Sequence, residues 1–148
     1  MTHLKDSIFI AAPPERVHAY AADPKTWSTW FAGLGEAESI EGDNSPGTVV
    51  KQSYMMMGMH LPITTTVTEH DARADGAWHW KADNAGSIDG WQSWDYRPQD
   101  GGTFVEVEME YEVPGSVFGK VADRLFVERN QERALRHTLE NLKQITES

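Results

Sequence analysis

The chain has 148 residues, the size of one domain with a sizeable core, and we expect residues 1–148 to form a single domain. Its 13 lysines and arginines against 23 aspartates and glutamates give a net charge of −10, and no basic stripe favours binding to nucleic acid. The absence of cysteine excludes disulfides, thiol nucleophiles and cysteine metal sites. The N-terminal apolar run is too short for a signal peptide or a membrane span, so we expect a cytoplasmic protein without stable membrane insertion.

The first part of the chain is predicted to form one strand and two short helices. Residues 7–12 are apolar and end at a pair of prolines, which is typical of a short strand followed by a helix N-terminus. A second helix is predicted to begin at Asp23-Pro24, with Asp23 as the N-cap and Trp27, Trp30 and Phe31 on its apolar face.

Six antiparallel strands are predicted next, because short stretches rich in β-formers alternate with turn residues. We place the strands at residues 36–41, 48–59, 63–72, 77–82, 88–97 and 103–113. The breaks between them are expected at residues 43–47, 61–62, 75–76, 84–86 and 100–102.

The last third of the chain has the clearest secondary-structure pattern. In residues 103–113, glutamates at every second position alternate with apolar side chains, which predicts a strand with one solvated and one buried face. After Pro114-Gly115, residues 116–147 contain no proline and predict one long helix of about 48 Å. Helices collected on one side of an antiparallel sheet indicate an α+β domain.

Two segments carry a resemblance to a known family. The stretch IFIAAPPERVHAYAADPKTWSTWF (8–31) and the ending from residue 101 to residue 145 resemble the START-like, or Bet v 1-like, superfamily, which includes the SRPBCC polyketide cyclase/dehydrase and lipid-transport group. The resemblance implies a helix-grip fold, in which a curved seven-stranded sheet wraps around the C-terminal helix and leaves an internal cavity. Members of this superfamily carry hydrophobic small molecules, and a minority catalyse ring closure or dehydration.

The candidate ligand-binding residues follow from which face of each strand points inward. If Asp100-Gly101 forms a two-residue hairpin turn, Val105 pairs with Tyr96, Val107 with Trp94 and Met109 with Gln92, whereas a shift of one residue would place Trp91, Ser93 and Asp95 inside instead. Because Lys51 is expected to point outward, Val50, Gln52, Tyr54 and Met56 on the same strand are expected to point inward. The predicted cavity wall comprises Tyr54, Met56, Trp78, Trp80, Gln92, Trp94, Tyr96 and Met109 from the strands, and Phe118, Val121 and Leu125 from the helix.

We expect the site to bind a ligand rather than to catalyse a reaction. The histidines show no metal-ligand spacing, no phosphate or dinucleotide loop is complete, and we assign no metal, cofactor or catalytic residue. An enzyme of the polyketide cyclase or aromatase type stays open as the alternative, with its acid or base among Tyr54, Tyr96 and Asp95.

Two further questions stay open at this level. The polar segment 128–133 of the long helix is either solvated or brings Asn130 or Arg129 to the polar end of a ligand. The acidic face of the sheet could instead bind a basic partner protein, with Trp91 as its anchor. The sequence sets no oligomeric state, and a homodimer is among the open alternatives.

Overall fold

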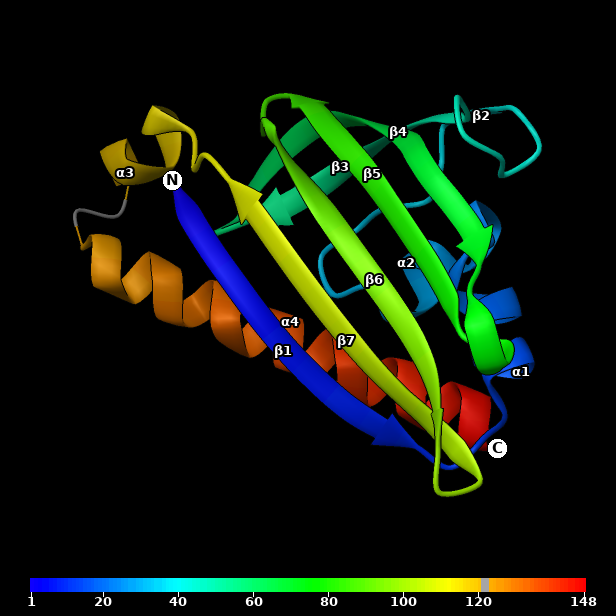
Figure 1. The fold of residues 1–148 in the computed structure, drawn as a ribbon. Coiled ribbons are helices and arrows are strands. Elements are labelled where there is room, and N and C mark those ends of the chain that lie inside the picture. Colours follow the sequence, from blue (N-terminus) through cyan, green and yellow to red (C-terminus); the bar gives the residue numbers. More distant parts are fainter. Residues whose placement is uncertain (121–122) are drawn as a thin grey trace.

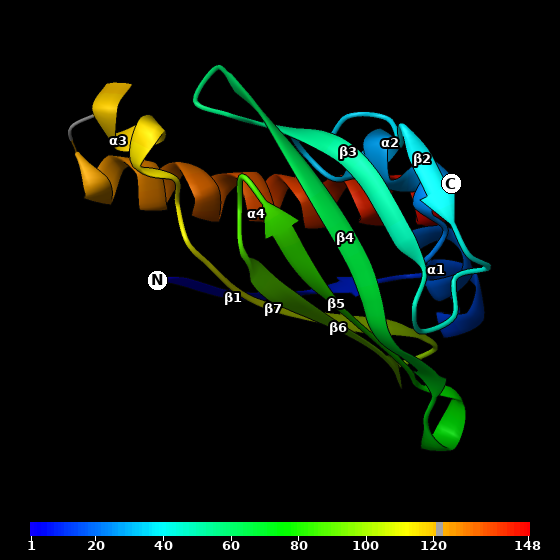
Figure 2. The same cartoon turned by 90° about the horizontal axis from the view of Figure 1, so that it is seen from above.

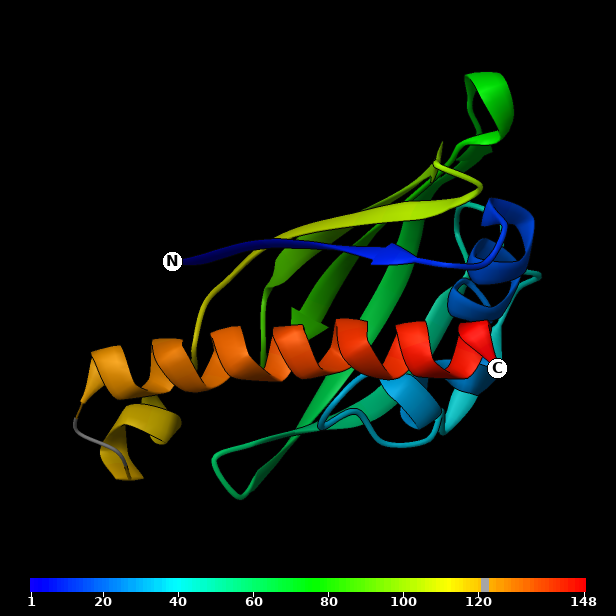
Figure 3. The same cartoon turned by 90° about the horizontal axis from the view of Figure 1, so that it is seen from below.

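The computed structural model describes residues 1–120 and 123–148, and the side chains of all of these except 118–120. Its seven strands form one antiparallel sheet in the order β1-β7-β6-β5-β4-β3-β2, and α4 lies along one face of it (Figure 1). The sheet curves past α4, while α1 and α2 pack near the C-terminal end of that helix (Figures 2 and 3). This arrangement confirms the predicted α+β helix-grip fold. The elements are β1 (Thr2–Ile10), α1 (Pro14–Ala21), the 3-10 helix η1 (Pro24–Thr26), α2 (Trp27–Trp30), β2 (Ser39–Glu41), β3 (Val49–Met56), β4 (Met59–Ala72), the 3-10 helix η2 (Ala74–Gly76), β5 (Trp78–Gly86), β6 (Gly90–Gln99), β7 (Gly102–Tyr111), α3 (Gly115–Lys120) and α4 (Arg124–Glu147).

The β6–β7 hairpin has the predicted register. Asp100 and Gly101 form the turn with φ angles of 48° and 77°, which suits a two-residue hairpin turn with both residues at positive φ. Tyr96 therefore pairs with Val105, Trp94 with Val107 and Gln92 with Met109. Because side chains alternate along a strand, this register places Gln92, Trp94 and Tyr96 on the same face as the buried residues of β7.

The predicted break at Leu61-Pro62 is wrong, and the turn between β3 and β4 lies at Met57-Gly58 instead. Met56 pairs with Met59, and the two turn residues have φ angles of 52° and 79°. Pro62 is tolerated within β4 because the pairing of β4 with β5 begins only at Ile63, so the missing N–H of Pro62 is not needed by that ladder.

Besides β4, two strands are longer than predicted. β1 begins at Thr2 and pairs with β7 along its whole length, although its first half is polar in sequence. β5 continues to Gly86, so the predicted break at residues 84–86 is displaced to the residues that follow. In both cases the neighbouring strand supplies backbone hydrogen bonds that no local sequence preference indicates.

The predicted long C-terminal helix is two helices. α3 ends at Lys120, and α4 begins at Arg124 after Asp123, whose carboxylate accepts hydrogen bonds from the backbone N–H groups of Leu125 and Phe126. Asp123 is thus an N-cap that starts a new helix. The 24 residues of α4 span about 36 Å, which is long enough to cross the sheet.

Candidate functional site: an aromatic cavity between the sheet and α4

A cavity of about 100 Å³ lies between the inner face of the sheet and α4, and it is partly open to solvent. Residues from six strands and three helices surround it. The lining comprises Leu4 of β1, Ala21 of α1, Trp27, Trp30, Phe31 and Leu34 of α2 and the loop after it, Gln52, Tyr54 and Met56 of β3, Ile63 and Thr65 of β4, Trp80 and Asn84 of β5, Ile88, Trp91, Gln92, Trp94 and Tyr96 of β6 and its preceding turn, Met109 and Tyr111 of β7, and Gln131, Ala134, Leu135 and Thr138 of α4.

The structure brings seven of the eleven predicted site residues together at this cavity. All seven come from the strands, where the two-residue alternation specifies the buried face once one residue is assigned. Met56, Trp94 and Tyr96 are almost completely buried. The seven residues are Tyr54, Met56, Trp80, Gln92, Trp94, Tyr96 and Met109.

Trp78 was predicted in the wall, but it lies outside the cavity lining. Its ring stacks on the imidazole of His18 in α1, with the ring centroids 4.0 Å apart and an interplanar angle of 9°. α1 thus covers the part of the inner face to which Trp78 contributes. Sequence alternation specifies the face of a strand but cannot show which helix covers each position along it.

Of the three predicted helix residues, only Leu125 has a described side chain, and it does not line the cavity. Leu125 is 52% exposed, because it lies in the first turn of α4, where the N-cap Asp123 sets the direction of the new helix. The side chain of Phe118 and the whole of Val121 lie outside the described residues. The part of α4 that faces the cavity lies further along, from Gln131 to Thr138.

The aromatic residues of α2 complete the wall, and they were predicted only as the apolar face of that helix. The rings of Trp27 and Trp80 meet edge to face at a centroid distance of 5.6 Å, and those of Trp30 and Trp94 do so at 5.4 Å. Such pairs stabilise packing beyond the area that they bury. The spacing of the two tryptophans by three residues places them on one helix face and was the sequence signal for this contact.

Side-chain hydrogen bonds hold α2 and the loop after it against α4. The amide of Asn141 donates to the carbonyl of Trp30 at 3.1 Å, and the backbone N–H of Ala32 donates to the hydroxyl of Thr138 at 2.9 Å. Both partners on α4, Asn141 and Thr138, are polar side chains. The aromatic side of the cavity is therefore fixed to the helix that closes it.

A chain of hydrogen bonds runs across the wall from β6 to β4. The indole N–H of Trp94 donates to Oε1 of Gln92 at 2.9 Å, and Nε2 of Gln92 donates to Oδ1 of Asn84 at 3.1 Å. Nδ2 of Asn84 then donates to the hydroxyl of Thr65 at 2.8 Å. These side chains satisfy one another, so they orient the wall without requiring a ligand.

A second polar contact joins β3 to α4. The hydroxyl of Tyr54 donates to Oε1 of Gln131 at 3.1 Å. Burial raises the pKa of Tyr54 to about 12, so its phenol stays protonated at neutral pH. The pKa of Tyr111 is also raised, first by burial and then by the nearby Tyr54 and the acidic side chains of α4.

Gln131 is a cavity residue that the sequence analysis missed. It is 6% exposed and lies four residues from both Val127 and Leu135, on the buried stripe of α4. Asn130 or Arg129 was the alternative to a solvated segment 128–133, but neither lines the cavity. The four-residue spacing from Leu135 was the signal that could have found it.

Three polar atoms on lining residues have no hydrogen-bond partner among the described residues. They are Oε1 of Gln52, Nε1 of Trp80 and the hydroxyl of Tyr111, all belonging to side chains that are less than 10% exposed. The other amide atom of Gln52, Nε2, donates to the carbonyl of Gly35 at 3.2 Å, which fixes the orientation of this amide. A buried polar atom without a partner costs free energy unless something else binds to it.

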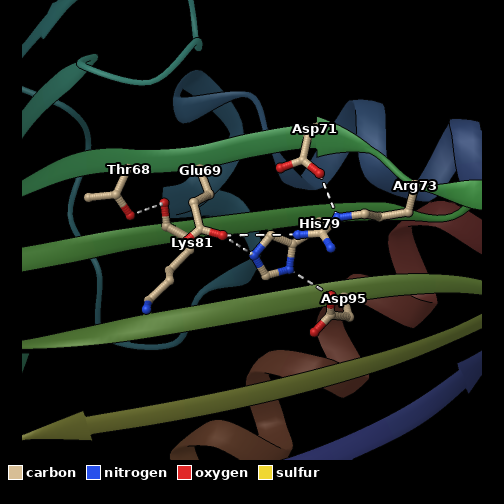
Figure 4. A network of polar contacts seen from close by, with 7 residues as sticks. All are labelled: Thr68, Glu69, Asp71, Arg73, His79, Lys81 and Asp95. Atoms are coloured by element: carbon tan, nitrogen blue, oxygen red, sulfur yellow. Dashed lines mark hydrogen bonds and ion pairs between the residues drawn. The ribbon is translucent and has the colours of Figure 1, made fainter.

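Charged side chains gather on the opposite face of the sheet. His79 lies between two carboxylates, with Nδ1 2.7 Å from Asp95 and Nε2 3.0 Å from Glu69, beside the Arg73–Asp71 ion pair (Figure 4). Asp95, which was a candidate acid or base, therefore does not face the cavity. Within the described part of the chain, no group of three or more histidine and carboxylate side chains is arranged to hold a metal ion, and no helix is long and apolar enough to cross a membrane.

A seven-stranded sheet that grips a C-terminal helix around an aromatic cavity defines the helix-grip class of proteins. The sequence matches the family model described as polyketide cyclase / dehydrase and lipid transport over residues 1–147. The chain therefore belongs to this family. A search among curated proteins finds no match to the chain.

Solved structures show the same fold at low sequence identity. TTHA0849 from Thermus thermophilus is 19% identical, with a TM-score of 0.73 over 97% of this chain and 96% of the other. The Zhui aromatase/cyclase from Streptomyces sp. R1128 is 18% identical, with a TM-score of 0.70 over 98% and 93% of the two chains. Ara h 8.0201 is 15% identical, with a TM-score of 0.65 over 97% and 96%. At these identities the similarity supports the fold alone.

Proposed function

We propose that this protein binds a hydrophobic small molecule, aromatic, polycyclic or lipid-like, in the cavity between the sheet and α4. The observation that carries the proposal is the wall itself: tryptophan, tyrosine, phenylalanine and methionine side chains surround the cavity, with a few oriented polar groups among them. This is the composition of small-molecule sites in general. The family description, which includes lipid transport, agrees with it. The cytoplasm, inferred from the sequence alone, is its proposed location.

The size of the cavity bears on the ligand. Its volume of about 100 Å³ is below the roughly 150 Å³ of an engineered protein cavity that binds benzene. A ligand with more than one ring would therefore extend through the open side or require wall side chains to move. The hydrogen bond from Tyr54 to Gln131 joins the sheet to α4, so a movement that separates the two would break it.

A pair of neighbouring methionines offers a matched test. Met56 is 1% exposed and lines the cavity, whereas Met55 is 46% exposed on the other face of β3. We expect Met56→Trp to fill the cavity and weaken binding of the neutral fluorescent probe N-phenylnaphthylamine at least tenfold, and Met55→Trp to leave it unchanged. Ala134→Leu, which would fill the cavity from α4, provides a second variant if Met56→Trp does not fold.

Equal probe binding by the wild type and both filling variants would contradict the proposal. Native mass spectrometry of the freshly purified protein gives an independent readout. A discrete bound mass that is lost in Met56→Trp and kept in Met55→Trp would support binding in this cavity.

A polyketide cyclase or aromatase is the second candidate, and the observation in its favour is the three phenols that line the cavity, those of Tyr54, Tyr96 and Tyr111. All three stay protonated at neutral pH, because burial raises their pKa values. A protonated phenol could donate a proton to a carbonyl oxygen of a bound polyketide. Loss of turnover in Tyr54→Phe with unchanged probe binding would establish this alternative.

A further inference from the structure

Three buried polar atoms of residues that line the cavity have no hydrogen-bond partner among the described residues; each is closed to solvent, so a ligand reaches it only when wall side chains move. Gln52, Trp80 and Tyr111 each contribute one such atom, and all three residues line the cavity. An indole N–H can only donate a hydrogen bond and an amide Oε1 can only accept one, while a phenol hydroxyl can do either. To pair with these atoms, a ligand must supply one acceptor, one donor and one group of either kind.

The directions of these atoms are set by neighbouring contacts. The ring of Trp80 is held edge to face against Trp27 at 79° between the ring planes. The amide of Gln52 is held by its donation to the carbonyl of Gly35, which can only accept, so Oε1 is the atom left without a partner. Neither side chain can turn to satisfy its free atom without breaking a contact that the structure shows.

The lining also restricts the charge of the ligand. Among the described lining residues there is no aspartate, glutamate, lysine, arginine or histidine. Glu69 and Asp95, whose carboxylates contact His79, lie on the outer face of the sheet (Figure 4). Burying an ionised group without an opposite charge is strongly unfavourable, and no cationic side chain of the described wall could pair with a carboxylate.

We propose that the bound molecule is uncharged and carries a hydrogen-bond acceptor for the indole N–H of Trp80 and a donor for Oε1 of Gln52. This inference rests on the proposed function, because it names the ligand class of the same cavity. It favours hydroxylated carbonyl compounds and disfavours fatty acids and other carboxylates, although all of these are hydrophobic. Tyr111 offers a third contact of either kind.

A series of related probes tests the inference directly. Dissociation constants at neutral pH are measured by calorimetry for naphthalene, acetonaphthone, hydroxyacetonaphthone and naphthoate. We expect acetonaphthone to bind about five- to tenfold more tightly than naphthalene, and hydroxyacetonaphthone more tightly again by a similar factor, as for one added hydrogen bond each. Naphthoate, which is anionic at this pH, should bind at least tenfold more weakly than acetonaphthone.

Variants assign each preference to its residue. Trp80→Phe keeps an aromatic ring and removes the N–H, so it should abolish the preference for acetonaphthone over naphthalene. Gln52→Met keeps the size of the side chain and removes the amide, so it should abolish the gain from the hydroxyl group. Trp78→Phe makes the same change two residues from Trp80 on the same strand but outside the cavity lining, and it should leave every ratio unchanged.

The outcomes separate this inference from the proposed function. If naphthalene binds but the polar analogues bind no more tightly, or if naphthoate binds as well as acetonaphthone, the cavity binds hydrophobic ligands without using these polar atoms, and the inference fails alone. The same holds if Trp80→Phe retains the ketone preference. If none of the four probes nor N-phenylnaphthylamine binds, the proposed function fails and the inference fails with it.

Discussion

The buried imidazole of His18 makes the stability of this protein sensitive to acid. His18 is 7% exposed, and its Nε2 lies 2.8 Å from Nε2 of His70. Nδ1 of His70 lies 2.6 Å from the carbonyl of Asn44, which can only accept, so a neutral His70 donates there and accepts from His18. The stacked ring of Trp78 and the edge of Tyr96 surround the remaining faces of the His18 ring.

This environment lowers the pKa of His18 from 6.5 to about 4, first through burial and then through repulsion from His70. Because the unfolded chain then binds a proton that the folded chain does not, the free energy of unfolding falls as the pH falls from about 6.5 to about 4. At roughly 1.4 kcal/mol per pH unit, the loss between pH 7 and pH 5 is about 2 kcal/mol. The stabilisation is fully present above this window.

Urea unfolding followed by tryptophan fluorescence at pH 7 and pH 5 measures this difference. His18→Gln keeps a donor for His70 but cannot be protonated, so we expect its stability to fall by about 2 kcal/mol less than that of the wild type over this interval. His137→Gln removes an exposed histidine of α4 and should behave as the wild type. An identical fall in stability in His18→Gln and the wild type would refute the reasoning.

Two further predictions concern stability. Tyr54→Phe leaves Oε1 of Gln131 buried without its donor and should lower the free energy of unfolding, measured by urea unfolding, by about 1–3 kcal/mol. Tyr20→Phe is the control: it removes only a solvent-exposed hydrogen bond to Thr29 and should cost less than about 0.5 kcal/mol. An equal cost for both would show that the buried contact contributes nothing. Gly90→Ala would place a Cβ 2.1 Å from a backbone carbonyl of β7 and should destabilise the sheet by about 1–3 kcal/mol or more. Gly115→Ala, where a Cβ meets open space, should be nearly neutral. Thermal unfolding compares the two variants, and a stable Gly90→Ala would mean that the strands separate there at little cost.

The inner wall of the cavity could be predicted from the sequence because it depends on local rules. A turn of two residues at Asp100-Gly101 specifies the register of its hairpin, and the alternation of side chains then specifies which residues of β6 and β7 point inward. The same alternation placed Tyr54 and Met56 on the inner face of β3. The order of strands and helices, together with the resemblance, was enough to predict the fold.

The tertiary structure decided what closes the cavity and where the cavity ends. The N-cap at Asp123 makes α4 shorter than the predicted helix and leaves Leu125 in solvent. The position of α1 places Trp78 against His18. Contacts between residues far apart in sequence, such as that of Tyr54 with Gln131, join elements whose relative placement no local periodicity describes. Local patterns determined the faces of the strands; the packing of helices on those faces, set by burial and hydrogen bonding across the whole chain, determined which of the inward residues surround a space and which fill the core.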